Sequence, residues 1–294
     1  MQYSSDKYTW GYEIEWGDID RTLEIPSHLG TWEQAEIDIV NIHEPYKYVA
    51  VDPLGINPPV GGEINTKPTR TWKEQVDRIM EIHQLFVDNG DTPSSSCVNH
   101  GHLHVHVPDL KNDIEALKRL IEYIKNNQAI TIKRLYNFRK NLIMEKMDFH
   151  YLEIDGGTPM PNKICDNIIN NSKNFDDFIE YHYSPKEYEE NLSPHVGSPQ
   201  RYAINTYIMQ YTNTIEFRCF RSSTNRKQIE DQFRFVEKFM DAALNGGPNV
   251  KQILSEYDYE FPPFIFNEEE YTGWQKTIYH VSRGKKDRKY HDVD

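Results

Sequence analysis

The sequence of residues 99–107 is Asn99-His100-Gly101-His102-Leu103-His104-Val105-His106-Val107, in which histidine occupies every second position. Because successive side chains of a β-strand point to opposite faces, the four histidines would share one face and the apolar residues the other. We therefore predict a strand from Val98 to Val107, closed by Pro108. A row of four imidazoles has no packing rationale, whereas neutral imidazole is a common metal ligand.

A pair of acids has the same two-residue spacing near the start of the chain. Within Gly11–Trp16, Glu13 and Glu15 would project from one face of a strand, and apolar or aromatic residues from the other. Two carboxylates about 6–7 Å apart on one strand face repel each other unless a positive charge lies between them. A divalent cation would remove that repulsion, and a solvated acidic face is the alternative.

Two further segments add charged groups at strand positions. Glu63 lies in the short predicted strand Gly62–Thr66, where taken alone it is a surface residue. Glu216 and Arg218 would share one face of the predicted strand Thr214–Arg221. They form either an ordinary ion pair or part of a phosphate site, in which the acid holds a metal and the guanidinium contacts phosphate oxygens.

Together the four segments predict a sheet face rich in Glu, His and Arg. Carboxylate oxygens favour Mg²⁺, and one or two imidazoles would let Mn²⁺ compete. Two or more such ions can neutralise a triphosphate and its transferring phosphoryl group. The sequence contains neither a Walker motif nor GxGxxG, which argues against P-loop and Rossmann nucleotide sites.

The remaining periodicity indicates an α+β fold with a largely antiparallel sheet. The predicted strands are Tyr8–Trp16, Trp32–Asn41, Tyr46–Val51, Gly62–Thr66, Val98–Val107, and a hairpin of Tyr202–Tyr211 with Thr214–Arg221. The first predicted helix starts at Thr71, which has capping-box spacing to Glu74, and Gly90 is expected just after its end. Further helices are predicted at 109–126, 129–147 (basic on one side), 175–181 and 228–244. Residues 155–199 lose the periodicity and are predicted to be a lid or an insertion.

Composition bounds the class of protein. The chain has 294 residues, enough for one large α+β domain or two small ones, and its 19 Tyr, 13 Phe and 5 Trp are typical of a folded chain. A net charge of −13 disfavours binding to duplex DNA. Three separated cysteines form no CxxC zinc motif or disulfide framework, and neither a membrane span nor a signal peptide is predicted. We therefore expect a cytoplasmic protein.

Four short motifs, in this order, resemble those of the phage and bacterial amidoligase family, which is similar to the glutamine synthetase and glutamate–cysteine ligase superfamily. They are Gly-Tyr-Glu-Ile-Glu at 11–15, Gly-Glu-Ile-Asn-Thr-Lys-Pro at 62–68, His-Val-His-Val at 104–107, and Arg-Tyr-Ala-Ile-Asn at 201–205 leading into Ile-Glu-Phe-Arg at 215–218. The resemblance spans residues 8–245. It implies one catalytic domain over 1–281 and a charged tail at 282–294, with a curved, mainly antiparallel sheet of the glutamine synthetase catalytic type and helices on its convex side.

The resemblance also implies roles for individual residues. The metal ligands would be Glu13, Glu15, Glu63, His104 and Glu216. The residues that contact ATP would be His106, Arg218, Arg221 and Asn205. The catalytic groups would be Arg218, Arg201 beside the acyl-phosphate, and Glu63 as the base that takes a proton from the amine. The family motif has one residue between its glycine and His-Val-His, whereas this chain has two, so His102 is the alternative metal ligand.

The activity implied by the resemblance is amide-bond formation between a carboxylate and an amine, through an acyl-phosphate. It would use ATP and Mg²⁺, with Mn²⁺ as a substitute. The substrates would be an amino acid or other small carboxylate and an amine, with a modified macromolecule as an alternative. A phage-encoded chain would act in the host cytoplasm, and self-association stays open.

Two other functions compete with the ligase. A metal-dependent hydrolase could use the histidine strand to hold zinc or iron and would need no ATP. Its usual folds predict either the βα alternation of a barrel or a run of short strands. A non-catalytic binding protein with a degenerate site is the third reading, and replacing Glu13 would separate it from an enzyme.

Overall fold

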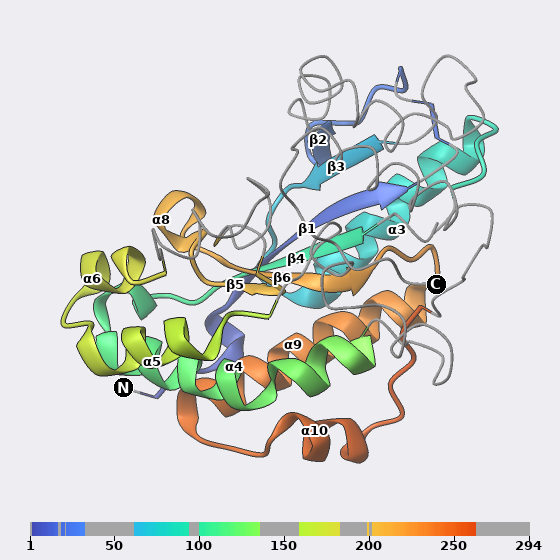
Figure 1. The fold of residues 1–294 in the computed structure, drawn as a ribbon. Helices are drawn as coiled ribbons and strands as arrows, with labels where there is room; N and C mark the ends of the chain where they lie inside the picture. Colours follow the sequence, from blue (N-terminus) through green and yellow to red (C-terminus); the bar gives the residue numbers. More distant parts are fainter. Residues whose placement is uncertain are drawn as a thin grey trace, which may run out of the picture.

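A computed structural model describes residues 2–16, 19–20, 22–32, 62–93, 100–135, 159–182, 199 and 202–262. Within these residues the chain forms an α+β fold, with an open sheet of six antiparallel strands and seven α-helices. Figure 1 shows the sheet above a layer that contains α9 and α4. The α+β class and the antiparallel sheet agree with the sequence prediction.

The sheet has the strand order β2-β3-β1-β4-β6-β5, so the first strand along the chain lies near its centre. The strands are β1 (Thr9–Trp16), β2 (Gly30–Trp32), β3 (Gly62–Thr66), β4 (His100–His106), β5 (Ile204–Asn205) and β6 (Ile215–Arg221). Every neighbouring pair runs antiparallel. The predicted strands at Tyr8–Trp16, Gly62–Thr66 and Val98–Val107 are therefore confirmed where the structure describes them.

The alternation in β1 gives the sheet two chemically different faces. Trp10, Tyr12, Ile14 and Trp16 are buried on one face, together with Leu103 and Val105 of β4 and Phe217 of β6. We call the opposite face, which carries Glu13, His102, His104 and Glu216, the polar face. Burying an aromatic or branched apolar side chain stabilises the fold by about 1.5–3 kcal/mol, so the apolar face fixes the register of these strands.

Two long helices cover the apolar face. In α9 (Arg226–Asn245), Phe233 lies 5.8 Å from the ring of Trp10, and Phe239 lies 5.3 Å from the ring of Phe217. In α3 (Trp72–Asp88), Phe86 contacts the Trp16 ring edge-on at 6.3 Å. The predicted helix at 228–244 is confirmed.

The start and end of α3 follow the predicted signals. The Thr71 side chain accepts from the backbone N–H of Glu74, and the Glu74 side chain accepts from the N–H of Thr71. This reciprocal capping box satisfies two N–H groups that the helix itself cannot. Gly90 follows the helix with φ +95°, a backbone region that glycine enters at no steric cost.

The two helices predicted at 109–126 and 129–147 are wrong in their boundaries. A short 3₁₀ turn, η2 (Leu110–Asn112), is followed by one continuous helix, α4 (Ile114–Leu135). The predicted break between the two helices falls at Asn127 and Gln128, inside α4. Both side chains instead bind other segments: Asn127 accepts from the N–H of Val250, and Gln128 bonds to the backbone of Met160.

The predicted hairpin of 202–211 with 214–221 is only partly correct. The first arm pairs with β6 over Ile204–Asn205 alone, and the chain then forms a short helix, α8 (Met209–Thr212). The Asn205 side chain accepts a hydrogen bond from the backbone N–H of Ile208, which turns the chain out of the strand. Asn213 ends α8 with φ 60°, in the left-handed region that asparagine tolerates.

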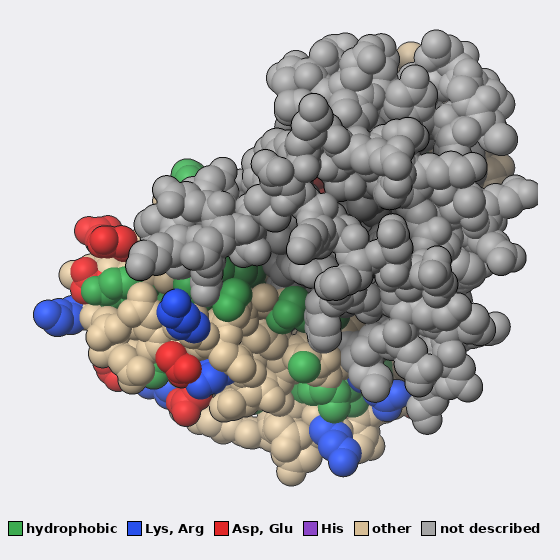
Figure 2. Space-filling model, in the orientation of Figure 1, with side chains coloured by type: hydrophobic (Ala, Val, Ile, Leu, Met, Phe, Trp, Pro, Cys, Tyr) green, Lys and Arg blue, Asp and Glu red, His purple; other side chains and the backbone are tan. Residues whose placement is uncertain are grey.

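The described part of 155–199 contains more regular structure than predicted. It holds α5 (Asn162–Asn171) and α6 (Phe175–Glu180), of which only α6 was expected. Besides η2 and α8, the other unpredicted elements are η1 (Ser5–Lys7), α10 (Val250–Glu256) and β2, which ends at Trp32, where a strand was predicted to begin. On the described part of the surface in Figure 2, Lys and Arg side chains are interspersed with Asp and Glu, so this face carries no continuous basic patch.

Several predictions fall outside the described residues. They are the strand at Tyr46–Val51, most of the strand at Trp32–Asn41, the basic helix beyond Leu135, the boundary at 281 and the tail at 282–294.

Among the described helices, none combines the length and hydropathy needed to cross a bilayer.

Candidate functional site

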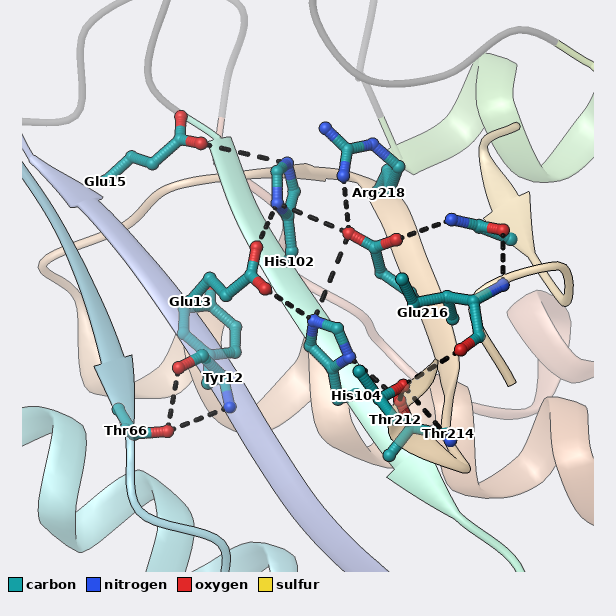
Figure 3. Close-up of polar contacts among 12 residues, drawn as sticks. Tyr12, Glu13, Glu15, Thr66, His102, His104, Thr212, Thr214, Glu216 and Arg218 are labelled. Atoms are coloured by element: carbon teal, nitrogen blue, oxygen red, sulfur yellow. Dashed lines mark hydrogen bonds and ion pairs between the residues drawn. The ribbon is translucent and has the colours of Figure 1, made fainter. Parts of the chain in front are cut away.

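The centre of the polar face is formed by Glu13 and two histidines. The antiparallel register sets Glu13 of β1 opposite His102 of β4, with His104 two residues further on. The carboxylate joins both imidazoles: Oε2 lies 2.5 Å from Nδ1 of His102, and Oε1 lies 2.8 Å from Nε2 of His104 (Figure 3). The alternation that predicted these three residues on one face is confirmed.

Glu216 approaches the same point from β6, on the other side of β4. It is paired with His104 in the strand register and is 2% exposed. Its Oε1 lies 3.5 Å from Nδ1 of His102, 4.0 Å from Nε2 of His104 and 2.5 Å from Nη1 of Arg218. Three strands therefore bring acids and imidazoles to one place, although the sequence separates Glu13 from Glu216 by about two hundred positions.

Glu13, His104 and Glu216 could hold a metal ion. One ligand atom from each residue lies within 4.8 Å of the other two. Two carboxylates and one imidazole suit Mg²⁺ or Mn²⁺, and the second imidazole, His102, contacts the same carboxylates. The Nδ1 of His104 lies 3.1 Å from the Thr214 hydroxyl, a contact of the kind that orients metal-binding imidazoles.

The electrostatics of this group follow from its burial. Although burial acts to raise it, the pKa of Glu13 is held well below its usual range by His104 and His102. Burial acts to lower the pKa of His104, but Glu13 and Glu216 raise it. Burial and the positive charge of Arg218 lower the pKa of His102. One imidazole is thus biased toward the charged form and the other toward the neutral form.

Arg218 supplies a buried positive charge beside the acids. Its guanidinium donates to Glu216, and its Nε has no hydrogen-bond partner among the described residues. Burial opposes ionisation, but Glu216, Glu13 and Glu15 raise the pKa of Arg218, which therefore stays charged. A guanidinium with an unused buried donor is suited to contact an anion such as phosphate.

Glu15 and Glu63 extend the polar face toward the edge of the sheet. They are direct partners across β1 and β3, and Oε1 of Glu15 lies 3.8 Å from Nε2 of His102. Like charges placed opposite each other destabilise a strand pair unless a positive group intervenes. The position of Glu15 is thus compatible with its predicted role next to the central group.

The other predicted site residues lie at different distances from the centre. Asn205 contacts Glu216 directly, with Nδ2 at 2.8 Å from Oε2. His106 lies at the end of the histidine row, where its ring contacts Asn213 at 2.9 Å and Thr9 at 3.4 Å. Arg221 is buried and is paired with His100 across β4 and β6. Arg201 falls outside the described residues.

Two features of the site were not predicted. The first is Thr214, which contacts His104. It is spaced by two residues from Glu216 and by four from Arg218, so strand alternation could have placed it on the same face. The second feature is an irregularity in β6: Gly101 pairs with Phe220, whereas Leu103 pairs with Phe217. Two residues of β6 therefore oppose one of β4, and a sequence pattern does not show where such a bulge falls.

A scan against protein-family models and a search of curated proteins each find no match to this chain.

Proposed function

We propose that the chain is an ATP-dependent carboxylate–amine ligase that forms an amide bond through an acyl-phosphate. One observation carries the proposal: β1, β4 and β6 direct Glu13, His102, His104, Glu216 and Arg218 at a common point. Sites for phosphoryl transfer from a triphosphate combine groups that hold a divalent cation with a positively charged side chain, such as arginine or lysine, that contacts the phosphates. An ordinary polar sheet face has no need to bury a guanidinium beside two acids and two imidazoles.

The residues present fit a divalent ion and a phosphate group. Glu13, Glu216 and His104 would hold the ion, which would supply charge neutralisation at the phosphates. Arg218 would contact phosphate oxygens with donors that Glu216 leaves unused. The proximity of Glu15 to His102 supports a second ion-binding position, as the resemblance to amidoligases implies.

The proposed chemistry has two steps. An oxygen of the substrate carboxylate attacks the γ-phosphorus, the bond to the β-γ bridging oxygen breaks, and ADP leaves. The amine then attacks the acyl carbon, the carbon–oxygen bond to phosphate breaks, and the amine loses a proton. Glu63 is the proposed base, because it lies in β3 beside Glu15 on the polar face. The substrate class is an amino acid or another small carboxylate and amine.

A metal-dependent hydrolase is the second candidate. Its support is the pair His102 and His104 around Glu13, since two imidazoles and one carboxylate form a known catalytic zinc set. The described sheet is antiparallel and open, however, and does not have the βα alternation expected of a barrel hydrolase. Arg218 favours an anionic substrate group such as phosphate, which the ligase requires and the hydrolase does not.

ATP dependence tests the proposal. Protein purified without chelator is incubated with ATP, Mg²⁺ and mixtures of amino acids and amines, and nucleotide products are separated by chromatography. The ligase predicts ADP and phosphate in proportion to a new amide. Glu13→Gln should abolish ADP release, whereas Glu122→Gln on the exposed face of α4 should not change it. Release of AMP and pyrophosphate, or hydrolysis without ATP, would reject the ligase.

A further inference from the structure

A single ten-residue segment contacts two of the three candidate metal ligands, His104 and Glu216. This segment runs from Asn205 at the end of β5, through α8, to Thr214 just before β6. We call it the β5–β6 clamp. At its first residue it contacts Glu216 and at its last it contacts His104, and neither contact belongs to the strand ladder itself.

The contact at Asn205 has a determined direction. The Oδ1 atom accepts from the backbone N–H of Ile208 at 3.1 Å, and a backbone N–H can only donate. The amide nitrogen must therefore face Glu216, where it donates to Oε2 at 2.8 Å. Asn205 is fully buried, so this orientation is enforced by packing as well.

This contact divides the two oxygens of Glu216 between different tasks. Oε2 is occupied by Asn205, whereas Oε1 faces His102, His104 and Arg218. A free carboxylate can rotate and bind an ion through both oxygens. Asn205 instead leaves one oxygen for the ion and fixes the direction of its lone pairs.

The contact at Thr214 does the same for His104. The hydroxyl lies 3.1 Å from Nδ1, while Nε2 faces Glu13 and Glu216. A hydroxyl that accepts from Nδ1 selects the form of the ring whose Nε2 carries the free lone pair. The Thr214 hydroxyl is itself held at 2.7 Å by that of Thr212, the last residue of α8.

Hydrogen bonds within the segment join these two contacts. The Thr212 side chain donates to the carbonyl of Ile208, and the N–H of Ile208 donates to Asn205. Asn213 also reaches back to the ring of His106 at 2.9 Å. A continuous series of hydrogen bonds therefore links the residue that contacts Glu216 to the residue that contacts His104.

We propose that the β5–β6 clamp positions Glu216 and His104 for a divalent ion, with Asn205 and Thr214 as its positioning residues. The inference rests on the proposed metal-dependent function. It adds that ion affinity is set by two residues that do not themselves bind the ion. Removal of such supporting hydrogen bonds typically weakens metal binding about 10–100-fold.

The test uses Mn²⁺ alone, because bound and free Mn²⁺ are distinguished by electron paramagnetic resonance. Thr214→Val removes the hydroxyl and keeps the branched shape, and Thr214→Ser keeps the hydroxyl and loses the methyl. We expect Thr214→Val to raise the Kd for Mn²⁺ about tenfold and Thr214→Ser to retain most of the affinity. The reverse order would show that Thr214 acts by packing and would overturn the proposal.

Asn205→Ala should raise the Kd by a similar factor, in protein whose circular dichroism shows it to be folded. Thr92→Val beyond the end of α3 and Asn126→Ala on α4, both at exposed positions, are matched controls and should bind like the wild type. Unchanged Kd values in both clamp variants would overturn the clamp alone. Wild-type protein that binds Mn²⁺ without forming ADP would contradict the ligase alone, and wild-type protein that binds no Mn²⁺ would overturn both.

Discussion

Gly101 lies so close to the Tyr12 side chain that a larger residue at this position would clash with it. A Cβ atom added there would lie 1.9 Å from the hydroxyl oxygen of Tyr12, which donates to Gln232 at 2.8 Å beneath the sheet. We predict that Gly101→Ala lowers the free energy of unfolding by about 2–3 kcal/mol, because Tyr12 must move or lose its partner. Urea denaturation measures the change.

Gly11 provides the control for this prediction. It lies in β1 on the other face, and among the described residues an added Cβ would meet only the Cβ of His104, at an ordinary contact distance of 3.5 Å. Gly11→Ala should therefore change the stability by less than about 1 kcal/mol. Equal effects of the two substitutions would show that the loss at Gly101 is not caused by the contact with Tyr12.

Glu13 controls the charge of His104. Its carboxylate raises the pKa of the imidazole against the effect of burial, so Glu13→Gln should lower the pKa of His104. Because ion binding needs the neutral ring, affinity for Mn²⁺ in the wild type should fall as the pH drops below this raised pKa. Nuclear magnetic resonance titration of the histidine ring protons measures the shift, and an unchanged His104 pKa would contradict the ion pair.

The residue scale is where sequence prediction succeeds best. Alternation alone places Glu13 with Glu15, His102 with His104, and Glu216 with Arg218, because parity in a regular strand fixes the face. Alternation does not predict the position of Arg221. Its number is odd, but the irregularity in β6 pairs it with the even-numbered His100. The contacts between strands depend on register, and register is set by packing that a local pattern does not contain.

At the scale of elements, α6 is tied to the clamp through one buried histidine. The Nδ1 of His182, just beyond α6, lies 2.7 Å from the carbonyl of Phe178, and Nε2 lies 2.7 Å from the Thr206 hydroxyl. A carbonyl can only accept, so Nδ1 carries a proton, and in the neutral ring Nε2 then accepts from the Thr206 hydroxyl. Burial lowers the pKa of His182 to about 4.

This lowered pKa makes the stability of the protein depend on pH. The unfolded chain takes up the proton near pH 6.5 and the folded chain only near pH 4, so stability is lost as the pH falls through that window. Between pH 7 and pH 5 the loss due to His182 should be about 2 kcal/mol. We expect His182→Gln to remove this part of the pH dependence in urea denaturation, and His28→Gln, at an exposed histidine, to leave it unchanged.

Elements were predicted well where their ends carry strong local signals. The capping box at Thr71 and the glycine after α3 located that helix to within a residue or two. The break predicted within α4 is wrong, because the polar residues Asn127 and Gln128 make contacts to Val250 and Met160 and do not end the helix. Those partners lie far away along the chain, so polar residues that break a helix and polar residues that join a helix to a neighbour look the same in sequence.

At the scale of the whole molecule, the site should couple ion binding to stability. Any ion that binds only the folded chain raises the midpoint of thermal unfolding, by an amount set by its concentration relative to Kd. We predict that Mg²⁺ with ATP raises the midpoint by several degrees relative to protein in EDTA, and that Glu13→Gln removes the increase. Differential scanning fluorimetry measures it, and an equal shift in both proteins would place the ligand elsewhere.

The overall architecture was predictable only as a class. Alternating strands and amphipathic helices indicated an α+β fold with antiparallel pairing, and the described residues have one. The order of the strands was not predictable. In the structure β1 pairs with β3 and β4, and β2 and β5 lie at the edges of the sheet. Such an order depends on which apolar surfaces fit together across the whole core.

The central place of β1 has a consequence for how the protein is made. A ribosome releases β1 before the other described strands of the sheet, and β4 follows about ninety residues later and β6 about two hundred residues later. Trp16 can meet Phe86 once α3 has been made, but Trp10 must wait for Phe233 of α9, and until then the nascent chain is a candidate for chaperones. The candidate site can therefore assemble only late in synthesis, because a chain that ends before β6 lacks Glu216 and Arg218.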